Sequence, residues 1–264
     1  MLVLLHGFTG CAQDFAPLLD ALGTPTDVLV PELPGFGRTP PLSGPEGASM
    51  PAFVKHLDDV LEAVHDGMDR PTVDLVGYSM GGRLALAYAL SPGACAMSRK
   101  AKVRSLVLIS ADAGLEPETA RAERRDLDDR RAERIREIGT RRFLREWQAQ
   151  ALFKAGRPLD PVLRRSLNRH RVSGAAEGWA AAIAGLSPGR TESLWPLLAQ
   201  LECPVLALAG ALDGRYAGLA AALAQAVQDG QHALINDVGH EAHLEDPRAV
   251  ARAMSDFYAS VAKV

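Results

Sequence analysis

The sequence predicts an α/β fold in which a mostly parallel, doubly wound sheet carries helices on both faces. Short continuous apolar runs, as expected for strands buried on both faces, alternate with longer amphipathic stretches of helical period. A chain of 264 residues, 47% of them hydrophobic, is long enough to form one large domain of this kind. The predicted strands are residues 2–5, 27–31, 73–76, 105–110, 205–209 and 233–236, which suggests a sheet of about six to seven strands. The predicted helices are residues 13–22, 51–68, 80–90, 219–227 and 247–261, the last with Asp246 as N-cap and Pro247 at its first position.

The alternation of strands and helices stops at Ser110 and resumes at Cys203. The segment between them is helical in pattern, highly charged and rich in arginine: it holds 16 of the 24 Arg residues. One interpretation is a solvated helix crossed by ion pairs between residues four apart. Because the sheet pattern continues afterwards, we expect instead a helical cap, residues 112–202, inserted into a core formed by residues 1–111 and 203–264.

Composition limits the kind of partner. The formal net charge of −3 and the pI of about 6.2 argue against a nucleic-acid partner, which favours a basic face. The three cysteines, Cys11, Cys95 and Cys203, form neither a disulfide framework nor a metal cluster in sequence. No apolar run reaches the ~18 residues needed to cross a membrane, and the run at residues 2–5 is too short for a signal peptide. We expect a cytoplasmic protein without membrane insertion and leave its oligomeric state open.

A nucleophile motif stands between a predicted strand and a predicted helix. Residues 77–81 read Gly-Tyr-Ser-Met-Gly, the pattern of a sharp turn that presents a strained, exposed serine above a helix N-terminus. The two glycines allow the backbones of strand and helix to pass closely. Ser79 is therefore the candidate nucleophile or base, and the surrounding strand and helix make the motif more specific than its letters alone.

A serine hydroxyl needs a histidine to accept its proton and an acid to orient that histidine. His240 follows the last predicted strand, where the order Ser, acid, His places the base. Asp213 is the expected acid because it comes just after the strand at 205–209, and Asp112 is the rival at a similar loop position. We expect His243, three residues beyond, to be a loop or surface residue.

The turn after the first strand supplies a candidate oxyanion hole. Residues 6–8 read His-Gly-Phe, and a His-Gly turn there exposes a backbone N–H. We nominate the N–H groups of Phe8 and of Met80, the residue after the serine. His6 is expected to brace the turn.

These motifs resemble the α/β-hydrolase fold, and within it the family of 2-succinyl-6-hydroxy-2,4-cyclohexadiene-1-carboxylate (SHCHC) synthases of menaquinone biosynthesis. Residues 5–10, Leu-His-Gly-Phe-Thr-Gly, are similar to the family's opening motif, and residues 77–83, Gly-Tyr-Ser-Met-Gly-Gly-Arg, to its serine motif. Residues 114–128 look like its Gly-Leu segment and the Arg/Glu-rich run that ends in Asp. Residues 239–247 resemble its Gly-His-x-Ala-His-x-Glu-x-Pro ending.

The resemblance implies a lyase that eliminates pyruvate from 2-succinyl-5-enolpyruvyl-6-hydroxy-3-cyclohexene-1-carboxylate (SEPHCHC), a small molecule with three carboxylates, without a cofactor or metal. Ser79, oriented through His240 and Asp213, would remove the ring proton. Carried over by position, the implied substrate-binding residues are Tyr78, Arg83, Arg124, Trp147 and Arg171; arginine forks suit carboxylates better than lysine does. The alternative is a serine hydrolase with the same triad, acting on an ester or a carbon–carbon bond.

Overall fold

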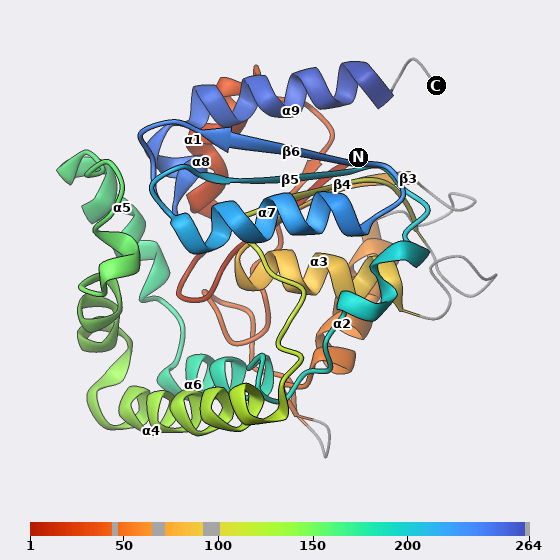
Figure 1. Cartoon of the computed structure of the whole chain (residues 1–264). Helices are drawn as coiled ribbons and strands as arrows, with labels where there is room; N and C mark the ends of the chain where they lie inside the picture. Colours follow the sequence, from red (N-terminus) through yellow and green to blue (C-terminus); the bar gives the residue numbers. More distant parts are fainter. Residues whose placement is uncertain (44–46, 65–71, 92–100, 262–264) are drawn as a thin grey trace.

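A computed structural model describes residues 1–43, 47–64, 72–91 and 101–261 and shows a parallel six-stranded sheet between two layers of helices (Figure 1). The strand order is β2-β1-β3-β4-β5-β6, and every pair of neighbours runs parallel, as predicted. The strands are β1 (Leu2–Leu5), β2 (Val28–Leu29), β3 (Thr72–Tyr78), β4 (Lys102–Ile109), β5 (Val205–Gly210) and β6 (Gly230–Ile235). The helices outside the stretch from β4 to β5 are η1 (Ala12–Phe15), α1 (Ala16–Ala21), α2 (Met50–Val64), α3 (Met80–Leu90), α7 (Gly214–Ala226), α8 (Ala242–Glu245) and α9 (Pro247–Val261).

Several predicted elements differ in their bounds. The second strand is confined to Val28–Leu29, and the first helical stretch divides into η1 and α1, with Pro17 in the first turn of α1. Helix α7 begins at Gly214, because the carboxylate of Asp213 accepts the N–H of Tyr216 and caps it. Residues 65–68 of the expected helix 51–68, and Cys95, lie outside the described residues.

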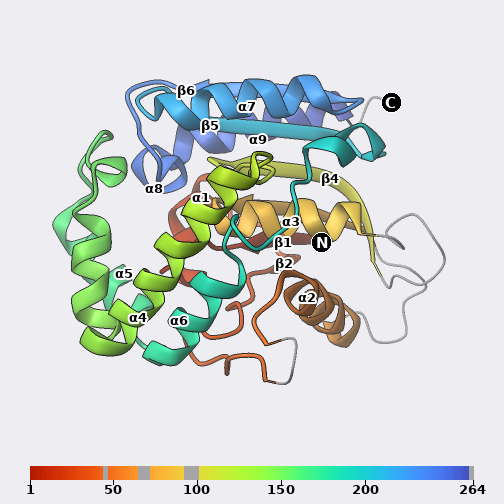
Figure 2. The same cartoon turned by 60° about the horizontal axis from the view of Figure 1, so that its bottom comes forward.

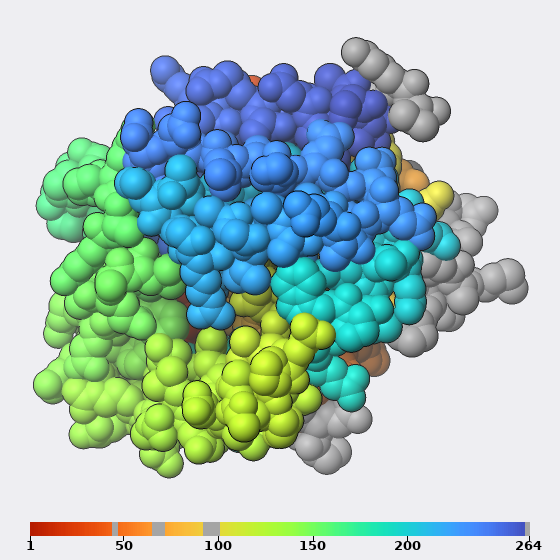
Figure 3. All heavy atoms as spheres, viewed as in Figure 1, coloured from red at the N-terminus to blue at the C-terminus, as the bar shows by residue number. Residues whose placement is uncertain are grey.

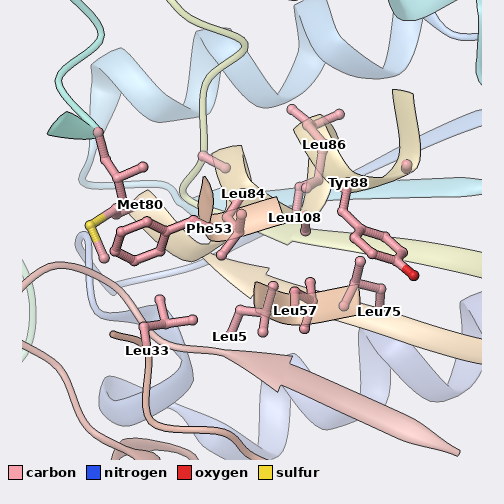
Figure 4. Close-up of a cluster of buried hydrophobic side chains, with 14 of the residues drawn as sticks. Leu5, Leu33, Phe53, Leu57, Leu75, Met80, Leu84, Leu86, Tyr88 and Leu108 are labelled. Carbon is pink, nitrogen blue, oxygen red and sulfur yellow. The ribbon is translucent and has the colours of Figure 1, made fainter. Parts of the chain in front are cut away.

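Side chains alternate between two cores, one on each face of the sheet. One core packs α2, α3 and α7 against the sheet through residues such as Leu5, Leu75 and Leu108, seen in Figure 4. The other packs α1 and α9 against the opposite face, through Leu4 and Val76 among others. Strands buried on both faces are rich in Leu and Val, which is why their sequences read as continuous apolar runs.

The stretch from Ile109 to Val205 is described in full and contains no strand. We call residues 112–202 the helical insert. It holds α4 (Glu118–Gln148), η2 (Ala151–Phe153), α5 (Pro161–Arg171), α6 (Ala176–Gly185) and η3 (Trp195–Gln200). Helix α4 is broken at Gly139, where φ is +73°. Ion pairs on its outer face include Arg136 with Glu177 of α6 and Arg134 with Glu146.

The insert lies at the edge of the sheet where the strands end. Figures 1 and 2 show α4, α5 and α6 toward the carboxyl ends of the strands, on the side away from the start of β1. In parallel α/β sheets this edge is where ligands bind. Within the described ranges, no helix is both long enough and apolar enough to cross a membrane; α4 has the length, with 31 residues, but is polar.

Candidate active site

Ser79 stands at the turn between β3 and α3, in the backbone conformation that the motif predicts. Its φ is +51°, a value that residues other than glycine rarely adopt. The Ser79 amide holds the turn by donating a hydrogen bond to the carbonyl of Ile109. A Cβ on Gly77 would lie 2.5 Å from the carbonyl oxygen of Gly81, and one on Gly81 would overlap the carbonyl of Leu5. Both glycines are therefore required by close backbone approach, as expected.

The structure brings Ser79, His240 and Asp213 into one hydrogen-bonded chain. His240 Nδ1 lies 2.6 Å from Asp213 Oδ2, and His240 Nε2 lies 3.2 Å from Ser79 Oγ. His240 and Asp213 are buried, and Ser79 is partly exposed. A carboxylate at Nδ1 favours the tautomer that carries the proton there, which leaves Nε2 free to accept the serine proton. The rival acid Asp112 instead accepts the N–H of Gly114 and lies 3.8 Å from Arg83 Nε.

Two backbone amides near Ser79 are available to an oxyanion. Neither the N–H of Phe8 nor that of Met80 donates a hydrogen bond within the described part of the chain. His6 holds the turn that carries Phe8: its Nε2 accepts the N–H of Leu33 at 3.1 Å, and its Nδ1 lies 2.8 Å from the carbonyl of Gly7. The imidazole thus has the bracing position that we expected.

Ser79 and His240 open onto a cavity of about 390 Å³ between the core and the insert. In Figure 3 the surface is hollowed between the green atoms of the insert and the blue atoms of α7. The described residues that line the cavity include four arginines and two aspartates, namely Arg83, Arg124, Arg131, Arg215, Asp112 and Asp128. No set of three or more His, Cys, Asp or Glu side chains in the described ranges is arranged to hold a metal ion.

Four of the five substrate-binding residues implied by the resemblance line this cavity. Tyr78 and Arg83 come from β3 and α3, and Arg124 and Trp147 from the two halves of α4. Arg83 is buried and donates to the carbonyl of Leu186 at 2.8 Å; burial lowers its pKa from the ordinary value, although Asp112 opposes that effect. Asp112 is the nearby carboxylate and lies 3.8 Å from Arg83 Nε, so the buried guanidinium can also bind a carboxylate of a ligand.

Arg131, which is not among the sequence-predicted site residues, also lines this cavity beside Arg124. Asp128 lies between them and is fully buried: it accepts Arg124 Nε at 2.7 Å and Arg131 Nη1 at 2.9 Å. The Arg131 guanidinium also lies 4.9 Å from the ring centroid of Trp147. Residues 124, 128 and 131 share one helix face because they are spaced by four and three. This spacing can be read from the sequence, but the many arginines nearby give similar spacings, so the sequence alone does not single out Arg131.

Arg171 is not where the resemblance implies. It is 4% exposed, does not line the cavity, and is committed to two carboxylates. Its Nε donates to Asp14 of η1 at 2.9 Å, and its Nη2 donates to Glu241 at 3.0 Å. These two acids hold the Arg171 pKa above its usual range despite burial. The expectation that Arg171 binds substrate is corrected: in this structure it joins α5 to the core.

The expectation for His243 is also wrong. The ring is fully buried rather than on a loop surface, and neither of its nitrogens has a hydrogen-bond partner among the residues that the structure describes. It packs against Tyr78 with ring centroids 4.3 Å apart and against Phe15 at 5.3 Å. Burial lowers the pKa of His243 to about 4, so it is a neutral core residue near neutral pH.

A larger hollow of about 1040 Å³ lies between α2, α3 and residues 190–197. It shares Arg83 with the first cavity but contains neither Ser79 nor His240. The chemistry described above therefore belongs to the smaller cavity.

Comparison with known proteins agrees with the geometry. A family model described as "Alpha/beta hydrolase family" matches residues 2–253. The chain is 31% identical over 256 residues to the 2-succinyl-6-hydroxy-2,4-cyclohexadiene-1-carboxylate synthase of Salmonella arizonae, covering 96% of this chain and 92% of that protein. The protein of the same name from Klebsiella pneumoniae is 28% identical over 260 residues, with 98% and 94% covered. The structure of MenH from S. aureus superposes with a TM-score of 0.86 at 27% identity, covering 99% of this chain and 94% of that one.

Proposed function

The protein belongs to the α/β-hydrolase family, and from this premise we propose that it is a lyase that eliminates pyruvate from SEPHCHC to give SHCHC in menaquinone biosynthesis. Proteins named as SHCHC synthases resemble it along nearly the whole chain. The observation that carries the proposal is the cavity beside Ser79, where Arg83, Arg124 and Arg131 converge. Such a set of guanidinium groups suits a substrate with three carboxylates and does not suit a neutral ester.

In the proposed reaction, Ser79 acts as the base. His240 Nε2 accepts the Ser79 hydroxyl proton, and Asp213 stabilises the resulting imidazolium. The serine oxygen then takes a proton from the substrate ring, electrons shift through the ring, and the C–O bond to the enolpyruvyl group breaks. The enolate that leaves takes up the proton held by His240 and becomes pyruvate. No bond to Ser79 is formed: the ring proton restores the serine hydroxyl, and loss of its proton to the enolate restores the neutral imidazole of His240.

Backbone N–H groups beside Ser79 could donate hydrogen bonds to the negative charge that develops in this step. Phe8 and Met80 line the cavity, their amides have no other partners among the described residues, and they would stabilise negative charge on a substrate oxygen. Met80 also begins α3, whose N-terminus favours negative charge. Such fixed donors need no reorganisation during the reaction.

We propose that the helical insert acts as the cap of this site. It contributes Arg124, Arg131 and Trp147 to the cavity wall, while the core contributes Ser79 and His240. Phe8 contacts Trp147 with ring centroids 5.0 Å apart, which places the wall of the insert directly on the proposed oxyanion hole.

The test is to add the protein to SEPHCHC and to follow pyruvate with a coupled assay. We expect pyruvate release, and we expect Ser79→Ala to lower turnover by about 10³-fold or more because the triad acts as a unit. High turnover of simple esters without pyruvate release would favour a serine hydrolase instead. Near-normal pyruvate release by Ser79→Ala would refute the role of the serine.

A further inference from the structure

We propose that Glu245 is a positioning residue that fixes the backbone on both sides of His240 and joins it to the helical insert. The proposal rests on the role of His240 in the proposed function, but it does not depend on which substrate is used. Glu245 is the last residue of α8 and does not line the catalytic cavity, so any effect on the reaction must pass through its neighbours.

The carboxylate of Glu245 accepts the amides that bracket His240. The N–H of Gly239 donates to Oε2 at 2.7 Å, and the N–H of Glu241 donates to Oε1 at 3.1 Å. One carboxylate oxygen therefore holds the peptide unit that follows His240, and the other holds the peptide unit between Val238 and Gly239, one residue before it. Hydrogen bonds to an ionised acceptor are about twice as strong as neutral ones, so this clamp is stiff.

A third amide comes from the insert. The N–H of Arg157 donates to Glu245 Oε2 at 2.7 Å. The two backbones are in direct contact here, since a Cβ on Gly239 would lie 2.8 Å from the nitrogen of Gly156. Phe153 of η2 also places its ring edge-on to His240, with centroids 5.7 Å apart. One carboxylate thus links the histidine loop to residues 153–157 of the insert.

These hydrogen bonds matter because the contact between His240 and Ser79 would be lost after only a small displacement of the histidine. His240 Nε2 lies 3.2 Å from Ser79 Oγ, already at the long end of a hydrogen bond, whereas Nδ1 is held tightly by Asp213 at 2.6 Å. A small shift of the His240 backbone would pivot the ring about Asp213 and break the contact with Ser79. Displacements of about 1 Å in such arrangements cost about 100-fold in rate.

The test uses a probe of Ser79 that is independent of the natural substrate. A fluorophosphonate forms a covalent bond to an activated serine, and its labelling rate at Ser79 reports the Ser79–His240 contact. The variant Glu245→Gln has the same shape but places an NH₂ group where one carboxylate oxygen accepts an amide. We expect the labelling rate to fall by about 10- to 100-fold. We also expect kcat for pyruvate release to fall while KM is unchanged.

The matched control is Asp160→Asn. Asp160 lies in the insert, and its carboxylate also accepts backbone amides, those of Val162 and Leu163, at the start of α5. This variant tests the loss of such an acceptor away from His240, and we expect its labelling rate to be unchanged. If Glu245→Gln does not fold, Glu245→Asp serves instead, since it keeps the charge but is one methylene too short to reach all three amides.

Two results would overturn the proposal. One is a folded Glu245 variant in which Ser79 is labelled at a rate within twofold of the parent rate. The other is an equal loss of labelling rate in Asp160→Asn. Slow labelling of the Glu245 variant, together with a parent protein that releases no pyruvate, would refute the proposed substrate and leave the positioning role supported.

Discussion

Replacing His243 by Phe should remove a large part of the acid sensitivity of this fold. The His243 ring is fully buried, and neither nitrogen has a partner in the described part of the chain. Burial lowers its pKa to about 4 from an ordinary 6.5. Asp14 and Glu241 favour its protonation, while Arg171 and His240 oppose it, and burial outweighs all of them. Between pH 6.5 and 4 the unfolded chain therefore binds a proton at this residue that the folded chain does not.

The sign of the effect follows from that difference. The folded state is favoured above the unfolded pKa, and this contribution is lost as the pH falls from 6.5 towards 4. At about 1.4 kcal/mol for each pH unit, the full loss is about 3 to 4 kcal/mol. His6 is also buried with a lowered pKa, and it acts in the same direction in both parent and variant.

The assay is urea unfolding of the parent and of His243→Phe at pH 7.5 and at pH 4.5. Phenylalanine keeps the ring contacts with Tyr78 and Phe15 but cannot be protonated. We expect the parent to lose about 2 to 3 kcal/mol more than the variant between the two pH values. Equal losses in the two proteins would show that His243 is not held neutral by the fold and would refute the reasoning.

Two further predictions concern binding and packing. Arg131→Gln should raise KM by about 10- to 100-fold with little change in kcat, since a charged hydrogen bond to a carboxylate is worth about 1.5–3 kcal/mol, whereas the exposed neighbour Arg130→Gln should change neither in the pyruvate assay. A similar KM in both variants would show that Arg131 does not bind the substrate. Gly81→Ala should destabilise the fold by about 2 kcal/mol or more, measured by thermal unfolding, because the new methyl group overlaps the carbonyl of Leu5. Gly218→Ala, on α7 where nothing lies within 4 Å of a Cβ, should be neutral or stabilising; equal losses would contradict the packing argument.

The parts of the site that the sequence predicts are those set by local chain order. Ser79 is preceded by a buried strand and followed by a helix, and the chain must turn sharply there whatever the rest of the fold does. Asp213 and His240 follow β5 and β6, which adjoin one another in a parallel sheet. Parallel strands end at one edge, so residues just after them meet without any knowledge of side-chain packing.

The parts that the sequence does not predict depend on partners far away in the chain. Arg171 looks like a free cation in an arginine-rich helix, yet Asp14, 157 residues earlier, accepts its guanidinium in the buried interior. His243 stands beside charged residues in sequence, but its short helix turns the ring inward against Phe15. No periodicity of α5 or α8 alone encodes either contact. They arise only when the insert packs on the core.

The charge of the cavity reconciles an acidic chain with the polyanionic substrate that we propose. The whole protein carries a formal charge of −3, but the described residues that line the cavity contribute four arginines against two aspartates. Both aspartates are already engaged: Asp128 binds Arg124 and Arg131 and so fixes their geometry, and Asp112 accepts a backbone amide. Two positive charges remain uncompensated among these groups, in a low-dielectric cavity where each acts more strongly than in water. A serine–histidine pair alone would serve a hydrolase equally well, so it is this excess that favours a carboxylate-rich ring as the group placed above Ser79.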